Sequence, residues 1–109
     1  DLAVLAKEIN DVTKFGILKT DKSGHLVDII EKPKKSKSKL AAIGLFVLNK
    51  YFFKYKLVPI GGGEFGLPQT LATMAKDHKI KILKAKHWHP IGHPEDIKSA
   101  EKVIHKFLR

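Results

Sequence analysis

Apolar and polar residues alternate along the first third of the chain in the manner of β-strands. The compact apolar segment 2–9 predicts a buried strand, and residues 15–20 and 26–31 predict two more. The four residues between the last two, 21–24 (DKSG), are a strong turn signal because glycine accepts a positive φ. Residues 15–31 are therefore predicted to form an antiparallel hairpin.

The middle of the chain breaks this alternation. The uninterrupted apolar run 41–49 is typical of a strand that is covered on both faces. Residues 51–55 predict a short helix that carries aromatic side chains into the core. The three glycines 61–63 predict a flexible loop.

Two helices and a strand are predicted in the last part of the chain. Apolar residues recur at helical spacing over 67–75, and residues 79–85 alternate lysine with apolar residues, as in a strand with one wet face. Pro94 suits the first residue of a second helix, whose positive end Glu95 and Asp96 complement. The apolar stripe of that helix consists of Ile97, Ala100, Ile104 and Phe107.

The order strand, hairpin, strand, helix, strand, helix predicts an α/β fold with a mixed sheet. The 109 residues suit one domain, 1–109. No run approaches the roughly 20 apolar residues that span a bilayer, so we expect a soluble, cytoplasmic protein. The absence of cysteine excludes disulfides and a thiolate zinc site. Because the chain starts at Asp1 within a strand pattern, we expect it to be a piece of a longer protein.

The net charge of +10 raises the question of nucleic-acid binding. Of the 21 basic residues only Arg109 is an arginine, the usual bidentate reader of guanine. A solubilising lysine surface is therefore favoured and nucleic acid is an improbable partner. A lysine-rich domain that binds anions or RNA stays open as an alternative.

The strand 26–31 ends on Glu31, Lys32 and Pro33, which present an acid and a base together. On the residues alone this is an exposed pair that caps an edge strand. Four segments in order, however, resemble the second half of the catalytic domain of sugar-1-phosphate nucleotidylyltransferases. These segments are KFGILKTDKSGHLVDIIEKPK, LAAIGLFVLNK, GGGEFGLPQTL and WHPIGHPEDIKSAEKVI.

This resemblance covers nearly the whole chain and implies a fold and an activity. The implied fold is a partial three-layer α/β/α (Rossmann-like) mixed sheet of the nucleotide-diphospho-sugar transferase type, with its N-terminal half missing. The implied reaction is attack of a sugar-1-phosphate oxygen on the α-phosphorus of a nucleoside triphosphate, with Mg²⁺ in the intact enzyme. The family's glycine-rich triphosphate loop does not occur here, so this part is not expected to bind a nucleotide productively by itself.

The resemblance also assigns roles to four residues. Lys32 would bind the sugar phosphate, and Glu31 would accept hydrogen bonds from the sugar. Gly16 would let the backbone approach the sugar ring, and Gly44 would be the small residue on the wall of the sugar pocket. No catalytic residue is assigned within this part of the domain.

Three positions depart from the family pattern. Pro90 stands where a magnesium-binding aspartate is usual, and proline has no side-chain oxygen to offer. Ala42 replaces an asparagine, and Gln69 lies in Leu-Pro-Gln where Leu-Thr-Asp is usual. Two interpretations follow: a transferase with other magnesium ligands, or a non-catalytic regulatory or assembly module. In either case an uncovered strand edge or helix face is expected to pair with the missing half or with another copy.

The histidines 87, 89 and 93 have a spacing that could bind zinc or nickel. No carboxylate or thiolate lies among them, so ordinary exposed or pocket-lining histidines are favoured. Trp88 is interpreted as a packing residue. Glu64, after the three glycines, either touches a sugar or is solvated.

Overall fold

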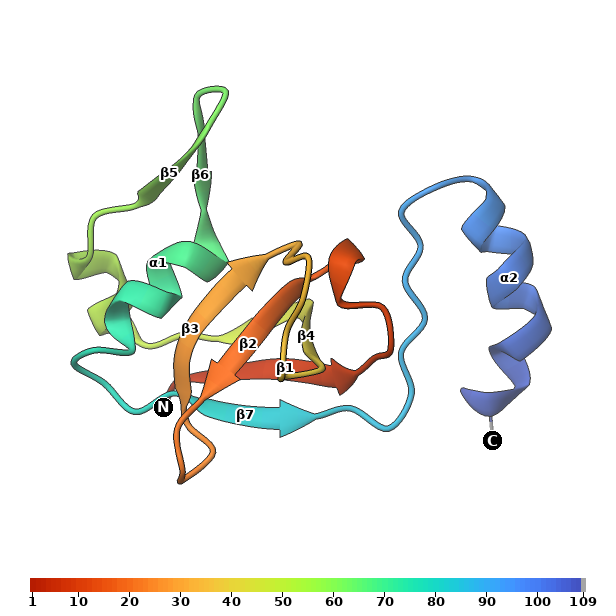
Figure 1. Ribbon diagram of the computed structural model, residues 1–109, viewed down its shortest axis with the longest axis horizontal. Helices are drawn as coiled ribbons and strands as arrows, with labels where there is room; N and C mark the ends of the chain where they lie inside the picture. The colour runs from red at the N-terminus through yellow and green to blue at the C-terminus, as the bar shows by residue number, and fades with distance from the viewer. Residues whose placement is uncertain (109) are drawn as a thin grey trace.

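Figure 1 shows the computed structural model, which describes residues 1–108. The main sheet has five strands in the order β3-β2-β4-β1-β7, and β5 and β6 form a separate two-stranded sheet. The strands are β1 Ala3–Glu8, β2 Gly16–Thr20, β3 Leu26–Glu31, β4 Leu40–Val47, β5 Val58–Gly61, β6 Glu64–Gly66 and β7 Lys81–Lys84. The helices are α1 Leu67–Met74 and α2 Glu95–Val103, with 3₁₀ turns η1 Val12–Lys14, η2 Lys50–Lys54 and η3 Ile104–Lys106.

The pairing of the strands confirms the predicted hairpin and mixed sheet. β2 and β3 are antiparallel, β1 is antiparallel to β4, and β1 is parallel to β7. The hairpin turn is fixed by Asp21, whose Oδ1 accepts hydrogen bonds from the backbone N–H groups of Ser23 and His25, each at 2.9 Å. An aspartate that binds its own turn in this way is the reason DKSG is a reliable turn signal.

The main core lies between the sheet and α1. Leu71 and Met74 of α1 are fully buried, and they belong to the same cluster as Leu18 of β2, Ile29 of β3 and Val4 of β1. The predicted apolar stripe of this helix is therefore confirmed. Ile17, next to Leu18 and so on the opposite face, is buried in a smaller cluster beside η1.

The prediction that β4 is covered on both faces is wrong. Leu45 is 57% exposed and Val47 is 44% exposed. Within residues 1–108 no helix covers this part of the strand, so a fully apolar sequence is left half in solvent. The register of β4 against β1 shifts between Val4 and Ala6, and Gly44 has φ +86° in that irregular stretch.

Two predictions for the middle of the chain are only partly right. The short helix is the 3₁₀ turn η2, which buries Phe52 but leaves Phe53 80% exposed. The three glycines, predicted as a flexible loop, lie at the turn of a hairpin: Gly61 ends β5, Gly62 and Gly63 lead into β6, and all three have positive φ. The β5–β6 hairpin could not be predicted, because Pro59 and the glycines interrupt the alternation that is typical of strands.

Helix α2 lies beside the sheet at the end of an extended segment, and not on either of its faces (Figure 1). It begins at Glu95, one residue after the predicted Pro94, and none of its residues is buried. The predicted apolar stripe is exposed, and α2 ends at Val103, before two of the stripe's residues. Ile97 of α2 is 53% exposed, Ile104 of η3 is 52% exposed, and Phe107, which follows η3, is 46% exposed. The α/β class is confirmed, and α1 supplies the single helical layer on the sheet within the described residues. None of the helices in residues 1–108 has the length and apolar character to cross a bilayer.

Candidate functional site

A cavity of about 560 Å³ opens where β3 ends, and we name it the Lys32 cavity. Three segments meet around it: η1 with the residue that follows it, the end of the β2–β3 hairpin, and the loop before α2, which is distant from the other two in the sequence. Its lining consists of Thr13, Lys14, Phe15, Lys32, Pro90, Gly92, His93 and Asp96.

The hairpin places Lys32 at the edge of this cavity. Its backbone N–H donates to the carbonyl oxygen of Phe15 at 2.9 Å, one residue beyond the Gly16–Glu31 pair that closes the ladder. Lys32 has φ +44°, the one positive φ of a non-glycine residue in the described chain. This conformation is unfavourable for a residue with a Cβ, and such residues cluster at functional sites.

Gly16 and Glu31 lie next to the cavity but do not line it. They are directly paired across β2 and β3, and a Cβ built on Gly16 would lie 3.4 Å from Glu31 Oε2. Glycine at this position therefore leaves the carboxylate of Glu31 room beside the strand. Glu31 itself is exposed and free to meet a ligand.

Gly44 is not brought to the cavity lining. It lies beyond the point where β4 pairs with β2 at Ala41, and nothing lies within 4 Å of a Cβ built on it. Three of the four predicted residues, Gly16, Glu31 and Lys32, are thus gathered at one strand end. Gly44 is not among them.

Asp96 holds the loop that forms the far wall. Its Oδ2 accepts hydrogen bonds from the backbone N–H groups of Gly92 at 2.9 Å and His93 at 3.0 Å. These two bonds, with smaller contributions from the charges of His93 and His89, hold the pKa of Asp96 below its ordinary value. The sequence predicted only that Asp96 complements the helix end, and not that it holds the loop before the helix.

An aromatic contact fastens the same loop to the hairpin. The rings of Trp88 and Phe15 meet edge to face, with centroids 5.3 Å apart. The interpretation of Trp88 as a packing residue is confirmed. Phe15 thus joins the segments twice, by its ring to Trp88 and by its carbonyl to Lys32.

Lys14 and Thr13 were not predicted as site residues. They reach the cavity because η1 is capped by Asp11, whose carboxylate accepts from the backbone N–H of Thr13 at 3.0 Å. Lys14 adds a second ammonium group to the cavity that Lys32 lines. The only signal in the sequence was the Asp-x-Thr cap, which says nothing about the neighbour of η1 in space.

The histidines do not gather into a metal site. Among residues 1–108 no group of three or more histidine, cysteine, aspartate or glutamate side chains could hold a metal ion. The ring of His87 instead packs against Phe107, with centroids 5.6 Å apart.

The cavity also does not fit magnesium, which requires hard oxygen ligands. Pro90 lines the cavity without a side-chain oxygen. Asp96 is the only carboxylate in the lining, and its Oδ2 is already shared by two N–H groups. Lys14 and Lys32 add positive charge, which favours an anion over a cation.

Comparison with known proteins gives consistent results. Residues 1–106 match the family described as nucleotidyl transferase. The chain is 32% identical over 103 residues to a bifunctional sugar-1-phosphate nucleotidylyltransferase/acetyltransferase of Sulfurisphaera tokodaii, covering 92% of this chain and 26% of that protein. It is 40% identical over 70 residues to a glucose-1-phosphate adenylyltransferase of Thermotoga maritima, covering 60% of this chain and 16% of that protein.

Solved structures agree on the fold. The chain matches an apo UDP-glucose pyrophosphorylase with a TM-score of 0.82 and 25% identity, covering 97% of this chain and 43% of that one. A UDP-glucose pyrophosphorylase complexed with UDP-glucose matches with a TM-score of 0.76 and 24% identity, covering 97% and 44%. The chain spans about a quarter of the length of the curated relatives that match nearly all of it. With 106 of its residues matched and the same fold, the chain belongs to the nucleotidyl transferase family.

Proposed function

We propose that this chain is the sugar-binding part of a cytoplasmic sugar-1-phosphate nucleotidylyltransferase. The intact enzyme would form a nucleotide sugar and pyrophosphate from a nucleoside triphosphate and a sugar-1-phosphate. The observation that carries the proposal is Lys32, held at φ +44° on the edge of a cavity that a second lysine also lines. The names of the relatives support the same class of reaction.

The charge of the Lys32 cavity suits a phosphate group. Lys14 and Lys32 supply two ammonium groups, and a charge-assisted hydrogen bond to phosphate is about twice as strong as a neutral one. Asp96 contributes one negative charge, so the two lysines still leave the lining net positive, and its Oδ2 is directed at the backbone N–H groups of Gly92 and His93. We assign the phosphate of the sugar-1-phosphate to the two lysines.

The sugar would lie toward the adjacent strand pair. Glu31 is exposed one residue before Lys32, and its carboxylate can accept hydrogen bonds from sugar hydroxyl groups. Gly16, directly opposite, presents no side chain that would block the ring. The role of Gly44 on the pocket wall stays a prediction.

In this reaction the nucleophile is an oxygen of the bound phosphate, and it attacks the α-phosphorus of the triphosphate as pyrophosphate leaves. No side chain has to form a covalent bond, so the contribution of this chain is to position that oxygen and to offset its charge. Magnesium would supply further charge neutralisation in the intact enzyme. The lining of the Lys32 cavity does not fit it, so its ligands would lie outside this cavity.

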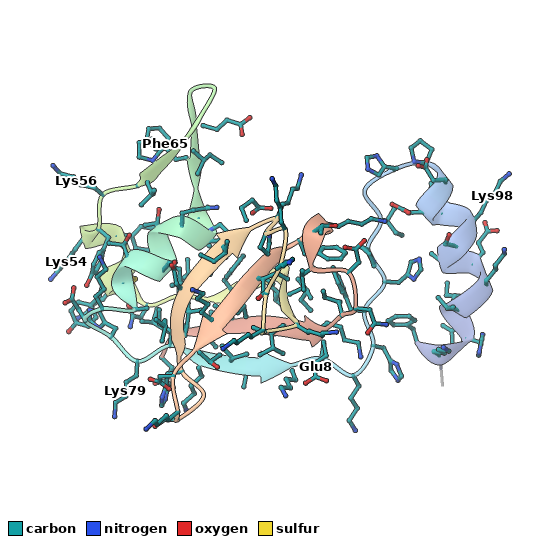
Figure 2. The ribbon with its side chains drawn as sticks, in the orientation of Figure 1. Glu8, Lys54, Lys56, Phe65, Lys79 and Lys98 are labelled. Carbon is teal, nitrogen blue, oxygen red and sulfur yellow. The ribbon has the colours of Figure 1, made fainter. Side chains whose placement is uncertain are left out.

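Isothermal titration calorimetry with glucose-1-phosphate tests this proposal. Lys32→Ala should weaken binding by about tenfold or more, since a charge-assisted hydrogen bond contributes about 1.5–3 kcal/mol. Lys54→Ala removes the same charge from η2, on another part of the surface (Figure 2), and should change the affinity little. Equal affinities of Lys32→Ala and the unmodified chain would refute the role of Lys32.

A second candidate function is a non-catalytic regulatory or assembly module that keeps the fold. Pro90 on the cavity lining favours it, as do Ala42 and Gln69 in the sequence. The test is pyrophosphate release by the longest natural chain and by its Pro90→Asp variant. Normal turnover of the unmodified chain would exclude the module, whereas turnover that appears only with Pro90→Asp would support it.

A further inference from the structure

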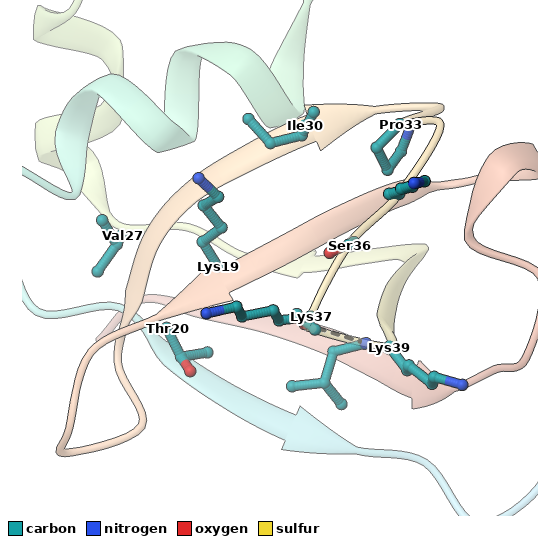
Figure 3. A pocket seen from close by; sticks show the side chains of 11 residues that line it. Lys19, Thr20, Val27, Ile30, Pro33, Ser36, Lys37 and Lys39 are labelled. Atoms are coloured by element: carbon teal, nitrogen blue, oxygen red, sulfur yellow. Dashed lines mark hydrogen bonds between the residues drawn. The ribbon is translucent and has the colours of Figure 1, made fainter.

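A second and larger cavity, of about 990 Å³, lies between the β2–β3 hairpin and the segment 33–39 that crosses β2 on its way to β4 (Figure 3). We name it the lysine hollow. Backbone hydrogen bonds hold both ends of the crossing segment. Just before it, the N–H of Lys32 donates to the carbonyl oxygen of Phe15, and at its last residue the carbonyl oxygen of Lys39 accepts from the N–H of Ile9 at 2.9 Å.

Four lysines and no acidic residue line the lysine hollow. Lys19 comes from β2, and the crossing segment adds Lys35, Lys37 and Lys39. Figure 3 shows the side chain of Lys37 extended across β2, whereas that of Lys39 extends to the opposite side of the segment. None of these lysines forms an ion pair with a carboxylate of residues 1–108.

One acid, Asp28, lies opposite Lys19 in the hairpin register. It does not line the hollow and forms no ion pair with Lys19, and its Oδ1 accepts the backbone N–H of Ile29 at 2.7 Å, so the lining carries four positive charges and no negative one. Like charges that gather around one cavity repel each other and attract a multivalent anion that can contact several of them at once. The charge of the lysine hollow therefore selects for more than one anionic group in the ligand.

The remaining lining fits the same kind of ligand. Thr20, Ser36 and Ser38 offer hydroxyl groups that can donate to phosphate oxygens. Val27 and Ile30 form an apolar floor on β3, and Val27 is 49% exposed. We infer that the lysine hollow binds a small molecule with two or more phosphate groups.

This site is separate from the one proposed for the sugar phosphate. The two cavities share no lining residue, although Lys32 lines one and the adjacent Pro33 lines the other. A bound anion would contact the segment that leads directly out of Lys32. Anion binding in the lysine hollow can therefore be tested independently of sugar-phosphate binding in the Lys32 cavity.

The probe is inorganic tripolyphosphate, titrated calorimetrically at low ionic strength with orthophosphate as the single-phosphate comparison. We expect tripolyphosphate to bind, orthophosphate to bind at least about tenfold more weakly, and Lys35→Ala/Lys37→Ala to lower the tripolyphosphate affinity by about tenfold or more. Lys54→Ala/Lys56→Ala is the matched control, since it removes the same two charges beside η2 (Figure 2). Circular dichroism checks that both variants are folded.

Adenosine triphosphate and a single-stranded RNA oligonucleotide are further arms of the same titration. Tighter binding of the nucleotide than of tripolyphosphate would support the inference and show that the apolar floor takes part. Equal weakening by both double variants would overturn it, since the binding would then follow total charge. The inference would also be overturned if tripolyphosphate did not bind. It would likewise be overturned if RNA bound through Lys35 and Lys37 and tripolyphosphate did not compete with it.

Discussion

Lys32 combines a backbone conformation that opposes stability with the phosphate-binding role proposed for it. A non-glycine residue in the left-handed region destabilises the fold by roughly 1–2 kcal/mol, and replacing it by glycine removes this cost. Glycine also makes the unfolded chain more flexible, which destabilises the fold by roughly 0.5–1 kcal/mol. Lys32→Gly should therefore leave the free energy of unfolding unchanged or raise it by up to about 1 kcal/mol. The same substitution should weaken glucose-1-phosphate binding by about tenfold or more, as for Lys32→Ala, because both remove the ammonium group.

Urea unfolding and calorimetry on one preparation check both halves of this prediction. Lys32→Ala is the control, because it removes the ammonium group but keeps the strained φ of +44°. If Lys32→Gly loses stability by more than about 1 kcal/mol, the backbone at this position is not strained in the way described.

The loop that Asp96 holds is predicted to depend on pH. Its pKa is lowered in the folded chain, chiefly by the N–H groups of Gly92 and His93. A carboxyl with a depressed folded pKa stabilises the fold above its unfolded pKa, and this contribution is lost as pH falls through the folded value. The amide NMR signals of Gly92 and His93 should therefore hold their positions until the pH is below the usual range for aspartate.

Asp96→Asn gives the companion measurement at neutral pH. The amide can still accept a hydrogen bond but carries no charge, so both amide signals should move toward their acid-state positions. A midpoint at the ordinary aspartate value, or unmoved signals in the variant, would show that Asp96 does not hold the loop.

At the scale of elements, the two helices should respond very differently to the loss of an apolar side chain. Leu71 of α1 is fully buried, so Leu71→Ala should lower the free energy of unfolding by about 2–5 kcal/mol. Ile97 of α2 is 53% exposed, so Ile97→Ala should cost less than about 0.5 kcal/mol. Denaturant unfolding measures both, and similar costs would mean that α2 packs on the fold in solution.

The elements that could be predicted from sequence are those whose local signal and tertiary surroundings agree. The hairpin 15–31 follows from its alternation and the Asp21 turn, and α1 follows from its stripe. The strands β5 and β6 could not be predicted, since Pro59 and three glycines interrupt them. The coverage of β4 was overestimated because an apolar sequence does not say whether an element lies on its second face.

The residues of the candidate site likewise fall into those that could be predicted from the sequence and those that could not. Lys32, Glu31 and Gly16 could be named because they are neighbours in the hairpin register. Asp96 could not, because it lies 64 residues beyond Lys32 and their meeting depends on contacts between distant segments, such as that of Phe15 with Trp88. Lys14 could not either, because the pattern does not say where η1 packs relative to the hairpin. The positive φ of Lys32 was hidden as well, since nothing in its side chain encodes it.

For the whole molecule, the exposed apolar residues of α2 and η3 form a face of the kind that packs against other structure. The chain covers 43% of the apo UDP-glucose pyrophosphorylase that matches 97% of it, so that relative has further structure to offer such a face. We predict that hydrogen exchange of the α2 amides is fast in the 109-residue chain and slow in a longer chain. Slow exchange in the 109-residue chain would mean that α2 is already packed.

The most direct test of the central claim is a crystal structure of the chain soaked with glucose-1-phosphate. The account predicts the phosphate in the Lys32 cavity, within about 3 Å of the Nζ atoms of Lys32 and Lys14, with the sugar toward Glu31 and Gly16. A Lys32 cavity that stays empty at saturating glucose-1-phosphate, or a phosphate bound there without contact to Lys32, would contradict it.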